Sequence, residues 1–196
     1  MLTQTQQRSF TLEEYRELEE TAECRNEYHN GEIIAMTGGT INHNRIIRNI
    51  GRVLGNLLQG KSSEVFLSDL RLWVPDYRRV FYPDVMVIED KPVLNEGRKD
   101  EVVNPSLIVE VLSNSTRDFD RGKKFRFYRS IPTFQEYLLI DQYEYWVEQY
   151  VKNKSGKWLF EEYEGADAKV ALLGGEVQIL MSDIYEGVTF EDEVAE

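Results

Sequence analysis

Hydrophobic residues recur at helical spacing in three parts of the chain. Residues 46–58 place apolar side chains three or four positions apart, as on one face of a long helix. The stretch Thr11-Leu-Glu-Glu14 has the form of a capping box, which predicts a first helix over residues 12–24. A third helix is expected to follow the turn-like residues 113–116 and to end before Pro132.

Shorter apolar runs, some of them alternating with polar residues, predict strands. Asn30-Gly31 separates two such runs and predicts a hairpin, because this pair accepts the positive φ angles of a tight turn. The strands are expected over residues 27–29, 32–36, 65–67, 70–74, 80–89, 107–112, 137–140, 145–151 and 158–163. Helices and strands in this order predict a mixed α/β (α+β) core with antiparallel additions.

The length of 196 residues is sufficient to bury a core without disulfides or metals, so we expect one domain over residues 1–196. Cys24 is the single cysteine and cannot form an intramolecular disulfide. No apolar run approaches the roughly 20 residues of a membrane span. The first ten residues lack the basic and apolar regions of a signal peptide. We therefore expect a cytoplasmic protein without a membrane partner.

The net charge of −12 at first argues against a nucleic-acid partner, because phosphate binding relies on clustered Lys and Arg. The distribution of the charge changes this interpretation. Residues 133–196 carry 15 acids and 4 basic residues, so the acidity belongs to the C-terminal third, which we expect to be β-rich from about residue 142. Residues 117–129 hold six basic residues and two acids, which form a basic island in an acidic protein.

Two carboxylates occupy unusual places in the expected strands. Asp84 opens one apolar run, in Tyr82-Pro-Asp-Val-Met-Val87, and Glu110 lies inside another. A bare carboxylate in an apolar strand costs several kcal/mol unless it is paired or bound to a cation. Each acid could meet an arginine or backbone N–H groups. If the strands are neighbours, the two acids could instead converge on a hard cation such as Mg²⁺, as in a phosphodiester-cleaving site.

A lysine near such a metal would orient the attacking water and offset negative charge in the transition state. The candidates are Lys123 and Lys124, which lie in the basic island. Lys124 and Tyr128 are four positions apart and share one face of the expected helix, whereas Lys123 is rotated away from it. We therefore select Lys124 as the catalytic lysine.

The same residues carry a family resemblance that extends from the first helix to about Asp141. The matching motifs are Glu27, Asn30-Gly-Glu-Ile33, His43, Tyr82-Pro-Asp-Val85, Val109-Glu-Val-Leu-Ser113, Ser115-Thr116, Asp120, Lys124, Tyr128, Glu136-Tyr137 and Asp141. Their order and spacing resemble the Uma2 family, a domain family common in cyanobacteria within the restriction-endonuclease-like, PD-(D/E)xK nuclease superfamily. The resemblance implies a central mixed sheet flanked by helices.

The resemblance also implies roles for single residues. Asp84 and Glu110 would bind Mg²⁺ or Mn²⁺, and the main-chain carbonyl of Val111 would complete the site. The superfamily's usual lysine, two positions after the glutamate, is absent because Leu112 stands there. In Uma2-like sequences a lysine on the following helix substitutes for it, which agrees with the independent choice of Lys124.

Four accessory candidates have two interpretations each. Glu27 is either a third acidic ligand or a solvated strand acid. Asp120 either bonds Lys124 across one helical turn or is an acid favoured at a helix start. His43 either contacts phosphate or acts in proton transfer, or it serves as a helix-capping or hydrogen-bonded structural histidine near a helix start. Tyr128 is either catalytic or packed with its hydroxyl bonded.

Aromatic residues gather near the start of the expected C-terminal hairpin. Tyr143, Tyr145, Trp146 and Tyr150 could stack on bases, but aromatics in a hairpin more often serve the core or a dimer interface. Many nucleases that cut duplexes need two active sites, which adds to the expectation of a homodimer.

These observations favour a metal-dependent endonuclease that hydrolyses DNA phosphodiester bonds. One alternative is a catalytically inactive module that keeps the nuclease fold and binds nucleic acid or protein. Another keeps the metal chemistry and acts on RNA or a different phosphodiester. The acidic C-terminal third gives this second alternative some weight.

Overall fold

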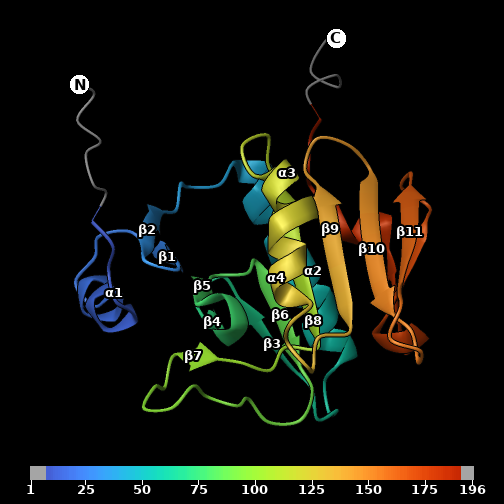
Figure 1. Cartoon of the computed structure of the whole chain (residues 1–196). Coiled ribbons are helices and arrows are strands. Elements are labelled where there is room, and N and C mark those ends of the chain that lie inside the picture. The colour runs from blue at the N-terminus through green and yellow to red at the C-terminus, as the bar shows by residue number, and fades with distance from the viewer. Residues whose placement is uncertain (1–7, 191–196) are drawn as a thin grey trace.

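A six-stranded sheet lies at the centre of the structure, a computed structural model that describes residues 8–190 (Figure 1). Its order is β11-β10-β9-β8-β6-β3, and β8 and β9 run parallel while the other neighbours are antiparallel, which confirms the expected mixed sheet. The strands are β3 (Glu64–Leu67), β6 (Val85–Ile88), β8 (Leu107–Leu112), β9 (Glu136–Asp141), β10 (Trp146–Lys152) and β11 (Trp158–Glu164). The start of the chain and the last six residues of its acidic third lie outside the described residues.

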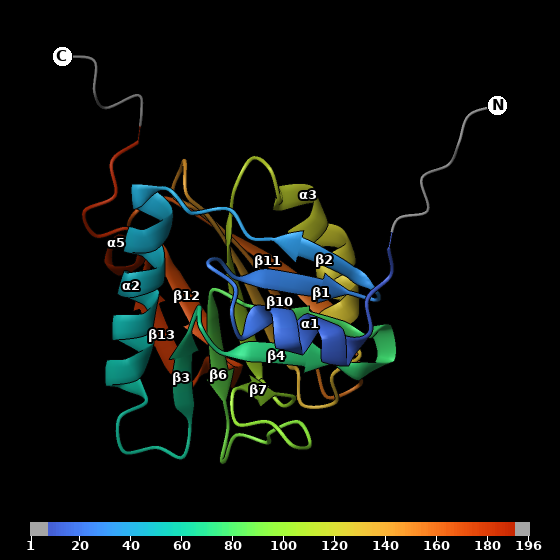
Figure 2. The same cartoon turned by 90° about the vertical axis from the view of Figure 1, so that its left-hand side faces the viewer.

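A second sheet has the order β2-β1-β5-β4-β7, and its strands run across those of the large sheet (Figure 2). Its strands are β1 (Asn26–His29), β2 (Glu32–Ala35), β4 (Arg71–Val74), β5 (Arg79–Phe81) and β7 (Glu101–Val102), and a separate pair consists of β12 (Lys169–Leu172) and β13 (Val177–Leu180). Asn30 and Gly31 join β1 to β2 with φ angles of 50° and 104°, as the Asn-Gly pair predicts.

Helices cover both faces of the large sheet, with α2 behind it in Figure 1 and the segment 117–128 in front. The helices are α1 (Leu12–Glu19), α2 (Ile41–Leu57), α3 (Arg117–Phe119), the π-helical turn η2 (Asp120–Lys124), α4 (Phe125–Tyr128) and α5 (Met181–Ile184), and two 3₁₀ turns are η1 (Pro75–Tyr77) and η3 (Leu173–Gly175). No helix within residues 8–190 has the length and apolar character required to cross a membrane.

Side-chain alternation along the large sheet divides the core in two. Val85 and Val109 face α2, and Met86 and Ile108 face the helical segment 117–128. By this alternation Glu110 belongs to the second face. The strand acid therefore points toward the segment that carries the predicted lysine.

The expected strand over residues 80–89 is wrong, because the chain forms two strands there. β5 ends at Phe81 in the small sheet and β6 begins at Val85 in the large sheet. Pro83 lies between them and has no N–H to donate to a strand ladder, which suits a point where the chain leaves one sheet for another. The tripeptide Tyr82-Pro-Asp84 thus crosses between the two sheets.

Two expected helices also differ from the structure. The capping box at Thr11 is present, but α1 ends at Glu19 rather than near Cys24, because the Glu19 carboxylate binds the N–H and side chain of Asn26 at the start of β1. The third helix is present but contains the π turn η2, which its apolar spacing did not indicate.

The aromatic residues near the C-terminal hairpin mostly serve the core. The Tyr150 ring lies 4.6 Å from that of Phe125, and the Tyr145 ring lies 4.8 Å from that of Tyr185. Tyr143 differs, because 41% of its surface is exposed.

Leu54 and Leu57 of α2 offer a matched test of this core. Leu54→Ala should lower the free energy of unfolding by about 2–5 kcal/mol, because Leu54 is fully buried against the large sheet. Leu57→Ala should cost less than about 1 kcal/mol, because Leu57 is 43% exposed. Urea unfolding followed by circular dichroism measures both values, and equal losses would contradict this packing.

Candidate active site

Seven of the eight predicted site residues line one cavity of about 430 Å³ at one end of the large sheet. They are Glu27, His43, Asp84, Glu110, Val111, Asp120 and Lys124. Tyr128 does not line this cavity and is fully buried. The register that pairs Val85 with Val109 brings Asp84 and Glu110 to neighbouring positions, as the sequence predicts.

The negative charge of the Asp84 carboxylate is compensated by a backbone N–H and a histidine. Its Oδ2 accepts a hydrogen bond of 2.8 Å from the N–H of Val111 and lies 3.4 Å from Nε2 of His43. His43 occupies the first turn of α2, where its N–H donates to the Thr40 side chain that caps the helix. Burial lowers the pKa of His43, but the hydrogen bond to Asp84 and the charges of Asp84 and Asp120 together outweigh it and raise that pKa above its usual value.

Lys124 is buried among three carboxylates. Its Nζ lies 2.9 Å from Oε1 of Glu110, 3.4 Å from Oδ1 of Asp120 and 3.9 Å from Oε1 of Glu27. The Tyr128 hydroxyl donates to the same Glu110 oxygen at 2.8 Å. The expected sharing of one face by Lys124 and Tyr128 is thus observed, and the Asp120–Lys124 ion pair is present.

The π turn η2 positions this lysine. Asp120 and Lys124 are its first and last residues and both are buried, whereas Lys123 beside them is exposed. The Tyr137 hydroxyl donates to the carbonyl of Asp120 at 3.2 Å and ties the turn to β9. Single π turns inside helices occur frequently at functional sites.

Burial and neighbouring charges shift the pKa values in this cluster. Burial raises the pKa of Glu110 to about 8, with further contributions from Asp84 and Asp120 and opposition from Lys124. Burial lowers the pKa of Lys124, but Glu110, Asp120 and Glu27 outweigh it and hold that pKa well above the usual value. Lys124 is therefore a permanent cation at neutral pH, and Glu110 is the group that titrates.

His29 is a member of the cluster that the sequence did not reveal. Its Nε2 lies 2.9 Å from Oε2 of Glu27, and its ring stacks on Phe119 at 5.7 Å. Burial raises the pKa of Glu27, but Lys124 and His29 outweigh it and hold that pKa below the usual value. Residues two apart on a strand share a face, so the spacing of Glu27 and His29 was the available signal.

The donor set fits a hard divalent cation bound by two carboxylates. Oδ1 of Asp84 and Oε2 of Glu110 accept no hydrogen bond from any residue between 8 and 190, and both residues line the cavity. Among those residues, no group of three carboxylate, imidazole or thiol side chains is arranged to hold one ion. Mg²⁺ commonly uses one or two carboxylates and retains several waters, which agrees with two ligating side chains.

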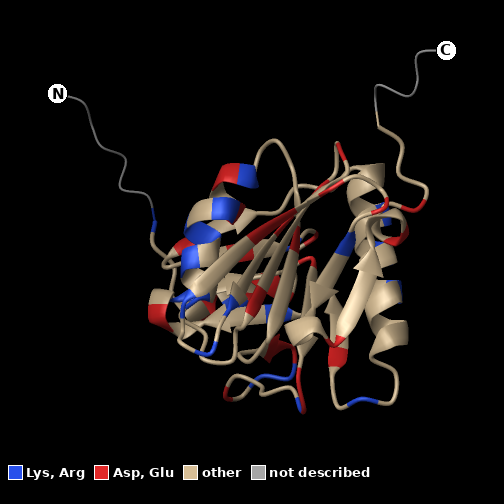
Figure 3. Ribbon diagram, turned by 90° about the vertical axis from the view of Figure 1, so that its right-hand side faces the viewer, with Lys and Arg blue, Asp and Glu red and all other residues tan. Residues whose placement is uncertain are grey.

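The basic island lies on α3, η2 and α4, where Figure 3 shows the blue bands of Lys and Arg. Part of it is neutralised, because Arg117 pairs with Asp141 and Arg121 pairs with Glu148.

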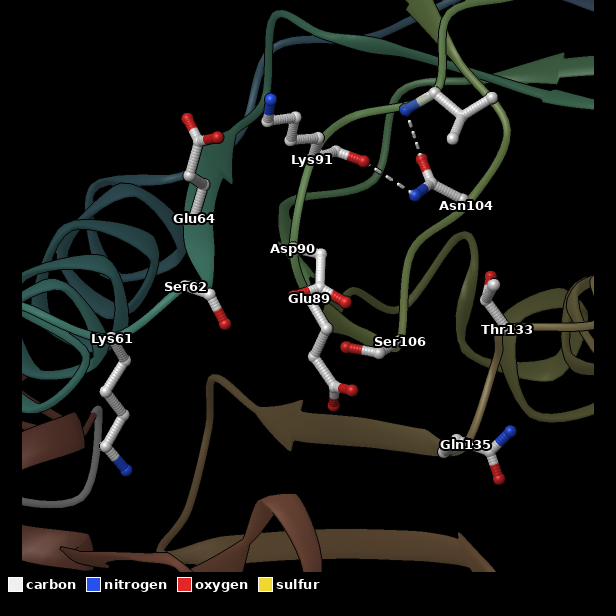
Figure 4. A pocket seen from close by; sticks show the side chains of 11 residues that line it. Lys61, Ser62, Glu64, Glu89, Asp90, Lys91, Asn104, Ser106, Thr133 and Gln135 are labelled. Atoms are coloured by element: carbon white, nitrogen blue, oxygen red, sulfur yellow. Dashed lines mark hydrogen bonds between the residues drawn. The ribbon is translucent and has the colours of Figure 1, made fainter.

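A larger cavity lies at the opposite end of the large sheet (Figure 4). Lys61, Glu64, Glu89, Asp90 and Lys91 line it, and Asn104 fixes the adjoining loop through bonds to Val93 and Lys91. It contains none of the predicted site residues.

The large mixed sheet brings two carboxylates together on neighbouring strands, with a lysine beside one of them, as expected for the restriction-endonuclease-like fold. The chain belongs to the Uma2 family, whose description reads "Putative restriction endonuclease" and whose sequence model matches residues 12–182.

Two relatives and a solved structure are similar to this chain over most of its length. The Synechocystis protein sll1609, named as uncharacterized, is 46% identical over 160 residues, which are 82% of this chain and 90% of that protein. Its counterpart slr1290, also named as uncharacterized, is 36% identical over 180 residues, which are 91% and 92% of the two chains. An Anabaena variabilis crystal structure described as "a putative nuclease belonging to DUF820" matches with a TM-score of 0.74 and 21% identity, over 92% of this chain and 99% of that chain. At that identity the match establishes the fold.

The raised pKa of Glu110 predicts how the stability of the protein depends on pH. Because its pKa rises from 4.5 to about 8 on folding, its contribution to stability is complete below about pH 4.5 and is lost as pH rises through 8. In chelator, wild type should lose about 2–4 kcal/mol of unfolding free energy relative to Glu110→Gln between pH 5 and 8. Urea titrations at each pH measure this difference, with the exposed Glu161→Gln as control. Parallel curves for wild type and Glu110→Gln would contradict the shift.

Gly39 predicts a test of the His43–Asp84 contact. A Cβ on Gly39 would lie 2.7 Å from Nδ1 of His43, whereas a Cβ on Gly38 would meet nothing within 4 Å. Gly39→Ala should displace the imidazole from Asp84 and lower the pKa of His43, and Gly38→Ala should leave that pKa unchanged. The sequence holds two histidines, so NMR titration of their ring protons in chelator resolves the change. An unaltered His43 pKa in Gly39→Ala would rule out this contact.

Proposed function

We propose that this protein is a metal-dependent nuclease that hydrolyses DNA phosphodiester bonds. The observation that carries the proposal is the 2.9 Å contact between Lys124 and Glu110, in a cavity that Asp84 also lines. The descriptions of the family and of the Anabaena structure name a nuclease, and that class is consistent with the donor set.

Asp84 and Glu110 would hold the metal, and the backbone carbonyl of Val111 would complete the site. The Val111 N–H points to Asp84, and in an antiparallel pair the N–H and C=O of one residue face the same partner strand. Extending the β6–β8 register by two positions places Pro83 opposite Val111. Proline has no N–H to donate, so the ladder leaves this carbonyl available as a ligand.

Each side chain has a physical role in hydrolysis. The metal would supply Lewis-acid polarisation of the phosphoryl oxygen and a lowered pKa for a bound water. Lys124 keeps its proton at neutral pH, so it acts as a cation that orients water and offsets developing negative charge, rather than as a general base. Tyr128 fixes Glu110 by its hydrogen bond, and His43 fixes Asp84. Glu27 and Asp120 hold Lys124 in place.

The identity of the metal, the oligomeric state and the number of domains are separate parts of the proposal. Mg²⁺ is the expected cofactor, and Mn²⁺ has the same ligand preference. A homodimer and a single domain over residues 1–196 stay predictions. The exposed edge strand β11 offers a surface for self-association, although Glu161, Glu162 and Glu164 place like charges along it.

Asp84→Asn and Lys124→Met should each lower metal-dependent DNA hydrolysis by at least about 100-fold, because the first removes a metal ligand and the second the buried cation. The matched controls are Asp118→Asn and Lys123→Met, which change exposed neighbours and should retain activity. Product formation from labelled single-stranded and duplex DNA, with RNA in parallel, measures the effect.

Titration calorimetry with Mg²⁺ and Mn²⁺ separates this proposal from a binding module without turnover. Binding at millimolar metal that Asp84→Asn abolishes supports the nuclease. Undiminished hydrolysis by purified Asp84→Asn, or no metal binding by wild type, would refute it.

A further inference from the structure

A second cavity of about 510 Å³ adjoins the candidate active site. The two cavities share Thr40, Gln142 and Tyr143 in their walls. Gln142 is fixed between them, because it accepts a hydrogen bond from Thr40 and donates one to the carbonyl of Leu112. A chain that leaves the active site past Gln142 enters this cavity, which we call the flanking cavity.

The chemistry of the flanking cavity differs from that of its surroundings. Among residues 8–190 no acid lines it, and the lining residues are Thr40, Ile41, Asn42, Arg45, Gln142, Tyr143, Thr189 and Phe190. The active site and the larger cavity of Figure 4 are each lined by at least three acids. In a protein with a net charge of −12, a cavity whose described lining holds an arginine and no acid, beside the candidate nuclease site, is complementary to an anionic strand.

Tyr143 provides a fixed aromatic face at the boundary of the two cavities. It lies in the loop between β9 and β10, where its N–H donates to the Asp141 side chain at 2.8 Å. The guanidinium carbon of Arg117 lies 5.9 Å from its ring centroid. Whereas Tyr145 and Tyr150 are packed into the core, Tyr143 is 41% exposed and can stack on a ligand.

Arg45 provides the cation. It projects from α2, and its guanidinium makes one long hydrogen bond of 3.5 Å to Asn42. No ion pair joins Arg45 to another side chain in the part of the chain that the structure describes, in contrast to Arg52 on the same helix, which binds Glu186. Its charge is therefore available to a phosphate.

We propose that the flanking cavity binds an unpaired nucleotide next to the scissile phosphodiester, with its base on Tyr143 and its phosphate at Arg45. The substrate is then a single strand rather than a duplex, because a paired base is stacked on its neighbours and cannot offer a face to Tyr143. The acidic remainder of the protein also disfavours contact with a long duplex backbone. This preference for a single-stranded substrate over a duplex rests on the proposed function.

Binding is tested without hydrolysis, by fluorescence anisotropy of the full chain in chelator. The probes are a labelled oligothymidylate of about 12 nucleotides and a duplex of the same length. Wild type should bind the single strand at least about tenfold more tightly than the duplex. Tyr143→Ala should weaken single-strand binding by about 5- to 100-fold and leave duplex binding unchanged, and Tyr143→Phe should restore it. Arg45→Ala should reduce the slope of log affinity against log salt by about 0.7.

Two controls have similar chemistry elsewhere on the surface. Phe160→Ala removes a 49%-exposed aromatic from β11, and Arg48→Ala removes an exposed arginine from α2 that does not line the cavity. Neither should change binding, and circular dichroism verifies that each variant is folded.

Equal affinity for the two probes, no binding of the single strand, or unchanged binding by Tyr143→Ala would overturn the proposal. A dimer in light scattering that Tyr143→Ala dissociates would assign the surface to a second copy and would also overturn it. These outcomes are distinct from a failure of the proposed function, which is the absence of metal-dependent hydrolysis by wild type.

Discussion

The ammonium group of Lys124, buried among Glu27, Glu110 and Asp120, is the interaction on which the local architecture depends. A buried charge of either sign costs several kcal/mol unless it is compensated, so none of these groups can be placed without the others. The carboxylates come from the small sheet, the large sheet and the π turn. One cation therefore joins three parts of the fold, and the requirement for charge compensation keeps these parts in contact.

Two departures from regular backbone make this cluster compatible with the active site. The crossing at Tyr82-Pro-Asp84 ends one strand and starts another, so Asp84 stands directly before β6 in the large sheet, where the N–H of Val111 can bind it. The π turn places both Asp120 and Lys124 on the buried side of the helical segment, and Lys123 is left in solvent. The strand break places Asp84 beside Glu110, and the helical segment turns Asp120 and Lys124 toward the same cavity.

The sequence predicted the residues of the site better than the secondary structure that positions them. Glu110 and Asp84 could be recognised because a carboxylate next to apolar strand residues needs compensation. Lys124 could be selected by its spacing from Tyr128, and both side chains do reach Glu110. The break at Pro83 was missed because residues 80–89 are apolar on both sides of it, and local patterns do not show which sheet a strand joins. The π turn was missed because its apolar spacing is close to that of an α-helix. His29 was missed because its partner Glu27 meets Lys124 only in the packed structure, which the local sequence does not show.

The origin of the cluster in two sheets has a consequence for the order of folding. Glu27 reaches Lys124 only when the small sheet has docked against the helical segment, and Asp84 meets Val111 only when β6 has paired with β8. For a protein proposed to cut nucleic acid, the complete cluster of carboxylates around the lysine therefore forms only when both sheets are folded and packed together.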